Sequence, residues 1–325
     1  MTMHSPKARS IYLAAALLLP AVALSQVYPS KPVRLVNPSA PGGTIDTQAR
    51  LFAQKLSELW GHQVVVENRA GSGGLLAADA VAKAAPDGHT MLFTSAQQAI
   101  SAAYYSKLPF DPLRDFSPVT QLSSTSFVLV ANLKVPATSL TELIALAKAR
   151  PGTLNYGSSG LGSSLHLAAE LFKNIANVDI VHIPYKSDAL TIPALLGNEV
   201  QVAFLPTLSA LNQMRSGKLR GMGVTSIRRA AVEPTLPTII EAGLPGYELS
   251  GWIGVLMPGA APRELVNTAR AGFVKALNLP DVAERLLKAG NELAGGTPEA
   301  FLAKYREDID LYRRIIRDAK VPLAE

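Results

Sequence analysis

The sequence contains no cysteine among its 325 residues. Disulfide bonds, thiolate metal sites and a lipid anchor on cysteine are therefore excluded. Metal-ligand spacings such as H-x-x-x-H or E-x-x-H are also absent, so we predict no metal and no cofactor. The fold must be held by its apolar core alone, and 48% hydrophobic with 17% charged residues is typical of a globular chain.

Clusters of basic residues are missing as well, and aromatic residues make up only 6% of the chain. Nucleic-acid-binding proteins usually combine grouped Lys and Arg with aromatic platforms, so we predict no nucleic-acid partner. Without Lys7 and Arg9 the chain has 29 basic and 25 acidic residues, a net charge of +4. This mild positive balance favours small anionic ligands.

Only one long hydrophobic run occurs, and it lies at the N-terminus. Lys7 and Arg9 precede an apolar stretch from Ile11 that continues to Leu24. The run is shorter than the ~20 residues that span a bilayer, which favours a signal peptide over a membrane anchor. We predict a signal peptide over 1–25, with the mature chain starting at Leu24 or Gln26, and a periplasmic location after cleavage.

From residue 33 onward, short runs of β-branched residues alternate with amphipathic helical stretches. This alternation is typical of parallel sheets covered by helices. The predicted strands are 33–36, 64–67, 90–94, 127–131, 154–156, 179–183, 200–205, 220–225 and 252–257. The predicted helices are 46–59, 75–83, one that begins after Ser139, 165–173, 189–196, 208–215 and three at the C-terminus. The last of these is capped by Thr297, with Pro298 in its first turn.

Two series of strands occur along one chain, and the C-terminal helices have too few strands for a third core. We therefore expect the C-terminus to return to the first lobe. The prediction is an α/β fold with one lobe from 26–125 and 228–325 and a second lobe from 126–227. Each lobe is expected to be a mainly parallel sheet flanked by helices, and two crossing segments would form a hinge.

Three strand-to-helix loops are rich in Gly and Ser, and ligands bind at such loops in parallel α/β sheets. In the first loop, 38–46, Gly42 and Gly43 let the backbone approach a ligand, and the helix dipole favours an anion. Asp46 complements that dipole. The alternative is a loop that only caps its helix.

The second loop, 68–74, contains Gly73 and Gly74 but neither the lysine of a P-loop nor the full G-x-G-x-x-G spacing. A nucleotide site is therefore not predicted. The third loop, 158–166, belongs to the other lobe and offers hydroxyls and amides at a helix N-terminus. Two such helix ends on opposite lobes would grip a carboxylate from both sides.

An enzyme is the alternative from another class, with His166 as its base. A Ser-His-Asp hydrolase needs a nucleophile such as that of G-x-S-x-G, and the 160–164 segment misses this pattern by register. His166 is more simply explained as a packed residue in the first turn of a helix. We predict no catalytic residue.

Several segments carry a resemblance to a known family. They are Tyr28-Pro29-Ser30-Lys31-Pro32, Pro41-Gly42-Gly43 with Asp46, Val66-Glu67-Asn68-Arg69, Asp115-Phe116-Ser117-Pro118-Val119, the 158–166 loop, Pro184-Tyr185-Lys186 and Trp252. Over nearly the whole mature chain the sequence resembles the Bug family, the substrate-binding components of tripartite tricarboxylate transporters. It departs from the family in two places. One is the 37–41 segment, and the other is Ser187, where the family commonly has a glycine.

The resemblance implies a type II periplasmic binding protein fold and the capture of a small carboxylate-bearing metabolite. It also implies two membrane subunits as partners and a monomeric receptor, with a sensor for a membrane receptor as the alternative role. Together with the loop analysis, it gives a set of predicted ligand-binding residues. They are Ser39, Pro41, Gly42, Gly43, Thr44, Asp46, Gly73, Gly74, Ser95, Ser159, Gly160, Ser163, His166 and Tyr185.

Overall fold

The structure is a computed structural model that describes residues 1–2 and 28–325. The apolar run and the cleavage point of the predicted signal peptide lie outside the described residues. Within the described ranges, no helix combines the length and the apolar character that crossing a membrane requires.

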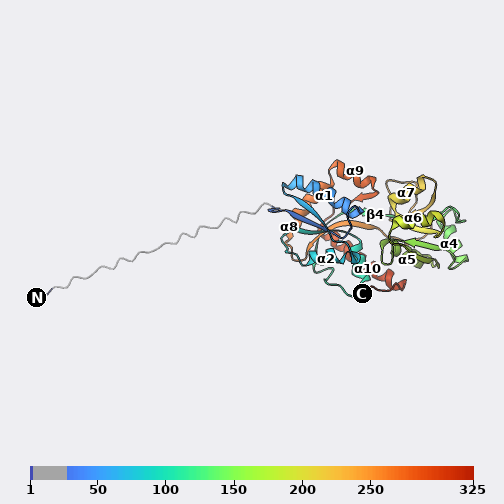
Figure 1. Cartoon of the computed structure of the whole chain (residues 1–325), viewed down its shortest axis with the longest axis horizontal. Coiled ribbons are helices and arrows are strands. Elements are labelled where there is room, and N and C mark those ends of the chain that lie inside the picture. The colour runs from blue at the N-terminus through green and yellow to red at the C-terminus, as the bar shows by residue number, and fades with distance from the viewer. Residues whose placement is uncertain (3–27) are drawn as a thin grey trace.

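The first sheet has six strands in the order β11-β4-β10-β3-β1-β2 (Figure 1). These strands are β1 (Val33–Asn37), β2 (Val64–Asn68), β3 (Thr90–Ser95), β4 (Phe116–Thr125), β10 (Gly251–Pro258) and β11 (Asn291–Leu293). Its helices are α1 (Thr44–Trp60), α2 (Leu75–Ala82), α3 (Gln97–Tyr104), α8 (Arg263–Leu277), α9 (Pro280–Lys288) and α10 (Pro298–Asp318). A short 3-10 turn, η1 (Ser72–Gly74), precedes α2.

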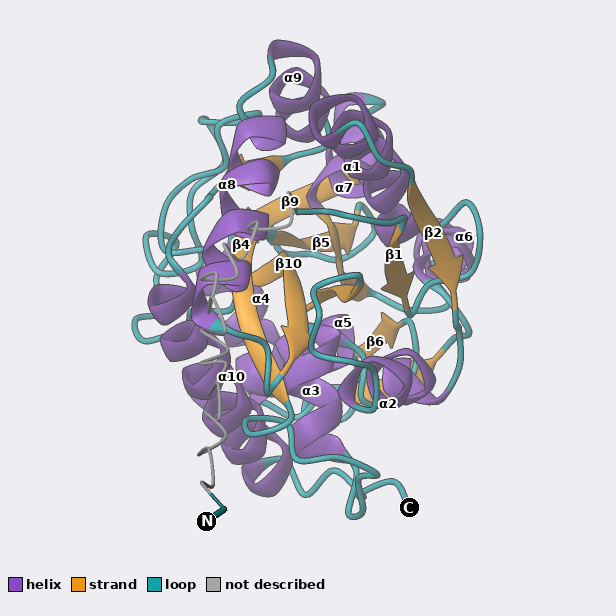
Figure 2. Cartoon of the chain, turned by 90° about the vertical axis from the view of Figure 1, so that its left-hand side faces the viewer, coloured by secondary structure: helices purple, strands orange, loops and turns teal. Residues whose placement is uncertain are grey.

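Helices cover both faces of this sheet, with α1, α8 and α9 on one side and α2, α3 and α10 on the other (Figure 2). The central strand β10 is buried along its whole length. Because side chains alternate along a strand, Val255 packs with α1 and α8 while Leu256 packs with α3 and α10.

The second sheet has five strands in the order β7-β6-β8-β5-β9. They are β5 (Phe127–Asn132), β6 (Asn155–Ser158), β7 (Val181–Pro184), β8 (Val202–Pro206) and β9 (Leu219–Val224). Helices α4 (Leu140–Ala149) and α5 (Ser164–Ala176) cover one face, and α6 (Asp188–Gly197) and α7 (Thr207–Arg215) cover the other. In Figure 1 these helices form the half of the molecule opposite α1, α8 and α9.

The α/β class with two sheets is confirmed, but the expectation of mainly parallel sheets is wrong. In the first sheet β1 pairs parallel with β2 and β3, whereas β10 is antiparallel to β3 and β4, and β11 is antiparallel to β4. In the second, β6 pairs parallel with β7 and β8, whereas β5 is antiparallel to β8 and β9. Among the described strands, every antiparallel pair includes at least one of β4, β5, β9 and β10, the strands at the two crossings.

Residues 228–249 contain no helix or strand and pack on the second sheet. The Val224 amide donates to the Pro237 carbonyl at 2.9 Å, and the Leu249 amide donates to the Thr225 carbonyl at 3.0 Å. These contacts favour a lobe boundary near residue 250 over the predicted one at 228. On the same side of the molecule, α5 and α10 belong to one apolar core, which includes Phe172, Tyr247 and Tyr312.

Candidate ligand-binding site

A cavity of about 240 Å³ lies between the two sheets, where the chain crosses from one to the other. Both crossings contribute to it, through the β4–β5 junction and the start of β10. Its lining residues are Thr44, Ile45, Ser95, Ala96, Thr125, Ser126, Phe127, Ser164, Pro206, Thr207, Gly251, Trp252, Ile253, Ala289, Gly290 and Asn291. None of these described lining residues carries a charge, so an ionic ligand would meet hydroxyls, amides and apolar surface.

Four helices begin at this cavity, two from each sheet. Thr44 is the first residue of α1, Ala96 is the N-cap of α3, Ser164 is the first residue of α5, and Thr207 is the first residue of α7. The first N–H groups of a helix have no partner inside the helix, and the dipole places roughly half a positive charge there. The cavity therefore favours an anion without offering it a charged side chain.

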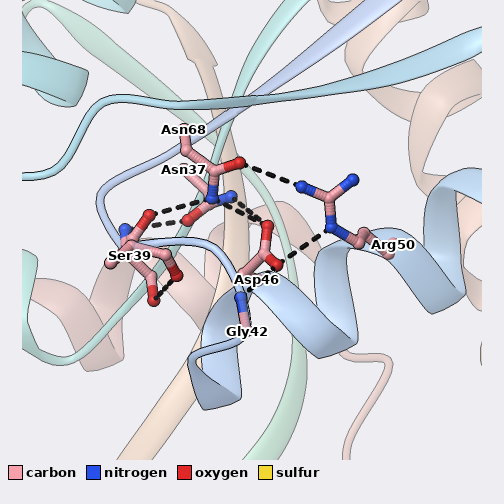
Figure 3. Close-up of polar contacts among 7 residues, drawn as sticks. Asn37, Ser39, Gly42, Asp46, Arg50 and Asn68 are labelled. Carbon is pink, nitrogen blue, oxygen red and sulfur yellow. Dashed lines mark hydrogen bonds and ion pairs between the residues drawn. The ribbon is translucent and has the colours of Figure 1, made fainter.

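Asp46 organises the loop before α1 (Figure 3). Its carboxylate is buried and accepts hydrogen bonds from the Gly42 amide at 2.8 Å, from Arg50 Nε at 2.9 Å and from Asn68 Nδ2 at 2.7 Å. The hydrogen bond from Arg50 is the main reason why the pKa of this carboxyl lies well below its ordinary value. Asp46 therefore positions the loop and is not exposed to a ligand.

The two glycine amides of this loop are used inside the loop. Gly42 N–H donates to Asp46, and Gly43 N–H donates to the Ala40 carbonyl at 3.1 Å. Within the described part of the chain, the next two amides, those of Thr44 and Ile45, have no acceptor. The free donors predicted at Gly42 and Gly43 therefore lie instead in the first turn of α1, at Thr44 and Ile45.

The loop of the second sheet is capped in a similar way. Ser163 is the N-cap of α5, and its hydroxyl donates to the Gly160 carbonyl at 2.8 Å and accepts from the His166 amide at 3.2 Å. The next residue, Ser164, lines the cavity. Helix capping therefore uses the Ser163 hydroxyl, and Ser164 is the residue of this loop that faces the cavity.

A model of the tripartite tricarboxylate transporter family receptor matches residues 48–320. The chain belongs to this receptor family. It is 33% identical to BugT of Bordetella pertussis over 92% of each chain. An R. palustris protein solved with adipate superposes with a TM-score of 0.79 and 34% identity, over 91% of this chain and all of that one. MatC from Rhodopseudomonas palustris, solved with malate, superposes with a TM-score of 0.76 and is 30% identical, over 89% of this chain and all of MatC.

Membership of the receptor family confirms the resemblance to the Bug proteins, and the structure places the predicted site residues in three groups. Thr44 and Ser95 line the cavity. Ser39, Pro41, Gly42, Gly43 and Asp46 build the loop behind Thr44, and Ser159, Gly160 and Ser163 build the loop behind Ser164. Gly73, Gly74, His166 and Tyr185 do not line the cavity.

The four residues that do not line the cavity, Gly73, Gly74, His166 and Tyr185, have structural roles elsewhere in the fold. The Gly73 carbonyl accepts from the Ser101 hydroxyl at 2.7 Å, which ties η1 to α3. Gly74 is buried and adopts a φ of 96°, a conformation that favours glycine. The Tyr185 amide donates to the Ser158 carbonyl at 2.9 Å, which continues the pairing of β6 and β7.

His166 lies in the interior behind the second loop. It is 2% exposed, its Nδ1 accepts from the Gly162 amide, and its ring lies 4.4 Å from that of His182. Burial lowers the pKa of both histidines to about 4, so both are neutral at pH 7. The buried ring of His166 therefore does not line the cavity and supports the loop from behind.

The cavity residues that the sequence analysis missed come mainly from the crossings. Thr125, Ser126 and Phe127 join β4 to β5, and Asn291 begins β11. Ser and Thr are frequent in β4, so its pattern gave no strand signal, and β11 has only three residues. Trp252, which carries part of the family resemblance, also lines the cavity, and its Nε1 donates to Asp308 at 2.7 Å.

Proposed function

We propose that this protein is a periplasmic receptor that captures a small carboxylate for the two membrane subunits of a tripartite transporter. The single observation that carries the proposal is the uncharged cavity at which four helices begin. An anion there is stabilised by helix N-termini and hydroxyls, and it is released without breaking an ion pair to a buried arginine. The adipate and malate bound to the two R. palustris relatives support the same ligand class.

The apolar part of the cavity restricts the class of carboxylate that it suits. Phe127, Trp252 and Ile253 provide apolar surface next to the hydroxyls of Thr44 and Ser164. A ligand with a short hydrocarbon body and a carboxylate end group would satisfy both kinds of surface. We infer that heavily hydroxylated acids bind less well than simple aliphatic or aromatic acids.

We also infer that two lobes close around the ligand, one formed by 28–125 and 251–325 and the other by 126–250. Thr44 and Ser95 come from the first, and Ser164 and Thr207 from the second, so a bound ligand would contact both. A ligand that contacts both lobes favours the closed state by the contacts that each lobe adds. Small-angle scattering should then give a smaller radius of gyration with ligand than without.

A hydrolase is less well supported by the geometry. The Ser158 hydroxyl lies 2.7 Å from His182 Nε2, which is the distance of a nucleophile and its base. Ser158, however, is fully buried, and it does not line the cavity. A substrate in the cavity therefore cannot reach this hydroxyl.

A thermal-shift screen tests the proposed function. Aliphatic, aromatic and hydroxylated carboxylic acids are compared with their primary amides, which keep the shape and lose the charge. An acid at about 100 times its Kd adds ~2.7 kcal/mol to the stability of the folded protein, a rise in Tm of roughly 4–5 °C for a chain of this length. If no acid raises Tm more than its amide does, the protein is not a carboxylate receptor.

A further inference from the structure

A second chamber, of about 370 Å³, adjoins the cavity. Thr44, Pro206 and Ala289 line both spaces, so the two meet at the first turn of α1. The walls of the second chamber come from α1 and α9 on one side and from the N-terminal ends of α6 and α7 on the other. A ligand that extends past Thr44 would therefore enter a space that is again shared between the two sheets.

This chamber differs from the cavity because charged side chains line it. Arg285 lies in the last turn of α9, and Asp188 is the first residue of α6 across the chamber. In the part of the chain that the structure describes, Arg285 forms no ion pair, whereas the next basic residue of α9, Lys288, pairs with Glu284 at 2.6 Å. Asp188 is compensated by the dipole of its own helix, which leaves the charge of Arg285 available for an anion.

A buried amide gives a second, independent indication of a ligand. Gln48, in α1, lines the chamber and is only 6% exposed. Its Oε1 is buried and has no hydrogen-bond partner among the described residues. Buried polar atoms in proteins nearly always have a partner, so an unpartnered amide in a chamber wall points to a polar group that binds there. The NH₂ group at the other end of the same amide is a hydrogen-bond donor, which suits an anion.

We propose that this chamber is a second subsite, which takes an anionic group at the far end of an elongated ligand. The first carboxylate lies in the cavity at the helix N-termini, and the chain of the ligand passes Thr44. The far group accepts from the Arg285 guanidinium, in the bidentate manner that suits a carboxylate, and from Gln48. The inference rests on the proposed function, because it requires a carboxylate in the first cavity.

The test compares unbranched α,ω-dicarboxylates of four to ten carbons with monocarboxylates of the same length, by isothermal titration calorimetry. Above the length that reaches Arg285, the wild-type protein should bind the diacid at least tenfold more tightly than the monoacid. Arg285→Gln should remove this advantage and leave the affinities of the monoacids and of the shortest diacids unchanged. Gln48→Glu, which places a carboxylate in the same chamber, should also weaken only the long diacids.

Lys275→Gln is the matched control, because it removes one exposed positive charge from the last turn of α8, outside the chamber. It should leave every affinity unchanged. The subsite is disproved if the wild type shows no advantage for diacids at any length, or if Arg285→Gln weakens monoacids and diacids equally. If the wild type binds none of these acids, the proposed function fails as well, so the two failures are distinguishable.

Discussion

Replacing Asp46 by Asn tests whether one buried carboxylate holds the loop at the cavity. The substitution keeps the size of the side chain but removes the charge that accepts from Gly42, Arg50 and Asn68. A hydrogen bond to a charged group contributes about 1.5–3 kcal/mol, and a buried donor left without a partner costs a similar amount. The charge attraction of Arg50, which is about half exposed, is screened by solvent and adds little beyond its hydrogen bond.

We therefore expect Asp46→Asn to lower the free energy of unfolding by about 2–4 kcal/mol at pH 7, a fall in Tm of roughly 3–6 °C. The pKa of Asp46 is lowered in the folded state, so its contribution is complete above the ordinary value of about 4 and is lost as the pH falls further. The difference between wild type and variant should therefore shrink at pH 3.5. Differential scanning fluorimetry at pH 7 and at pH 3.5 measures the difference in Tm between wild type and variant.

Glu284→Gln is the matched control for this experiment, because Glu284 and Lys288 form an i,i+4 pair like that of Asp46 and Arg50, but both are exposed. Solvent screens such an exposed pair, so this variant should unfold like wild type. The reasoning is refuted if Asp46→Asn is as stable as wild type at pH 7, or if the loss of stability is the same at pH 7 and pH 3.5.

Three further predictions concern the cavity and its support. Ser164→Ala should weaken carboxylate binding by about 1 kcal/mol without changing Tm, because its hydroxyl faces the cavity; calorimetry would contradict this if the affinity were unchanged. Ligand should change the tryptophan fluorescence through Trp252, so the change should persist in Trp60→Phe and vanish in Trp252→Phe. Burial lowers the pKa of His166, so between pH 6.5 and pH 4 the unfolded chain binds a proton that the folded protein does not, and the protein loses stability. His166→Gln should reduce this loss. An unchanged dependence of stability on pH would argue against a neutral, buried His166.

The regular elements of the fold were largely predictable from the sequence. The continuous apolar run at 252–257 and the helical spacing of Phe52 and Leu56 are strong local patterns, and both elements are present close to the predicted limits. Strand direction was not predictable, because whether β10 runs parallel or antiparallel to β3 depends on where the chain crosses between sheets. A strand such as β4, which combines Ser, Thr and Pro118 with few apolar residues, has no pattern of its own.

The site was predictable as a set of loops but not as a set of contacts. Gly-rich segments before helices indicated the ends of α1 and α5 correctly, because glycine there serves turns that any such loop needs. Which amides are free depends on hydrogen bonds between distant residues, such as that from Asn68 to Asp46. Spacing along the chain contains no information about those bonds. The proposed subsite with Arg285 was equally hidden, since α9 reaches the chamber only through the packing of the C-terminal region.

The apolar core shared by α5 and α10 has a consequence for how this protein folds. Phe172 of α5 and Tyr312 of α10 belong to one core, and the Tyr247 hydroxyl donates to the Ala168 carbonyl within it. Neither half of the molecule can complete its own interior, because the last helix of the chain covers part of both. A chain shortened before residue 298 would leave apolar surface bare on each half, so we expect neither half to reach its full stability without α10. Unfolding should then be one cooperative transition and not two.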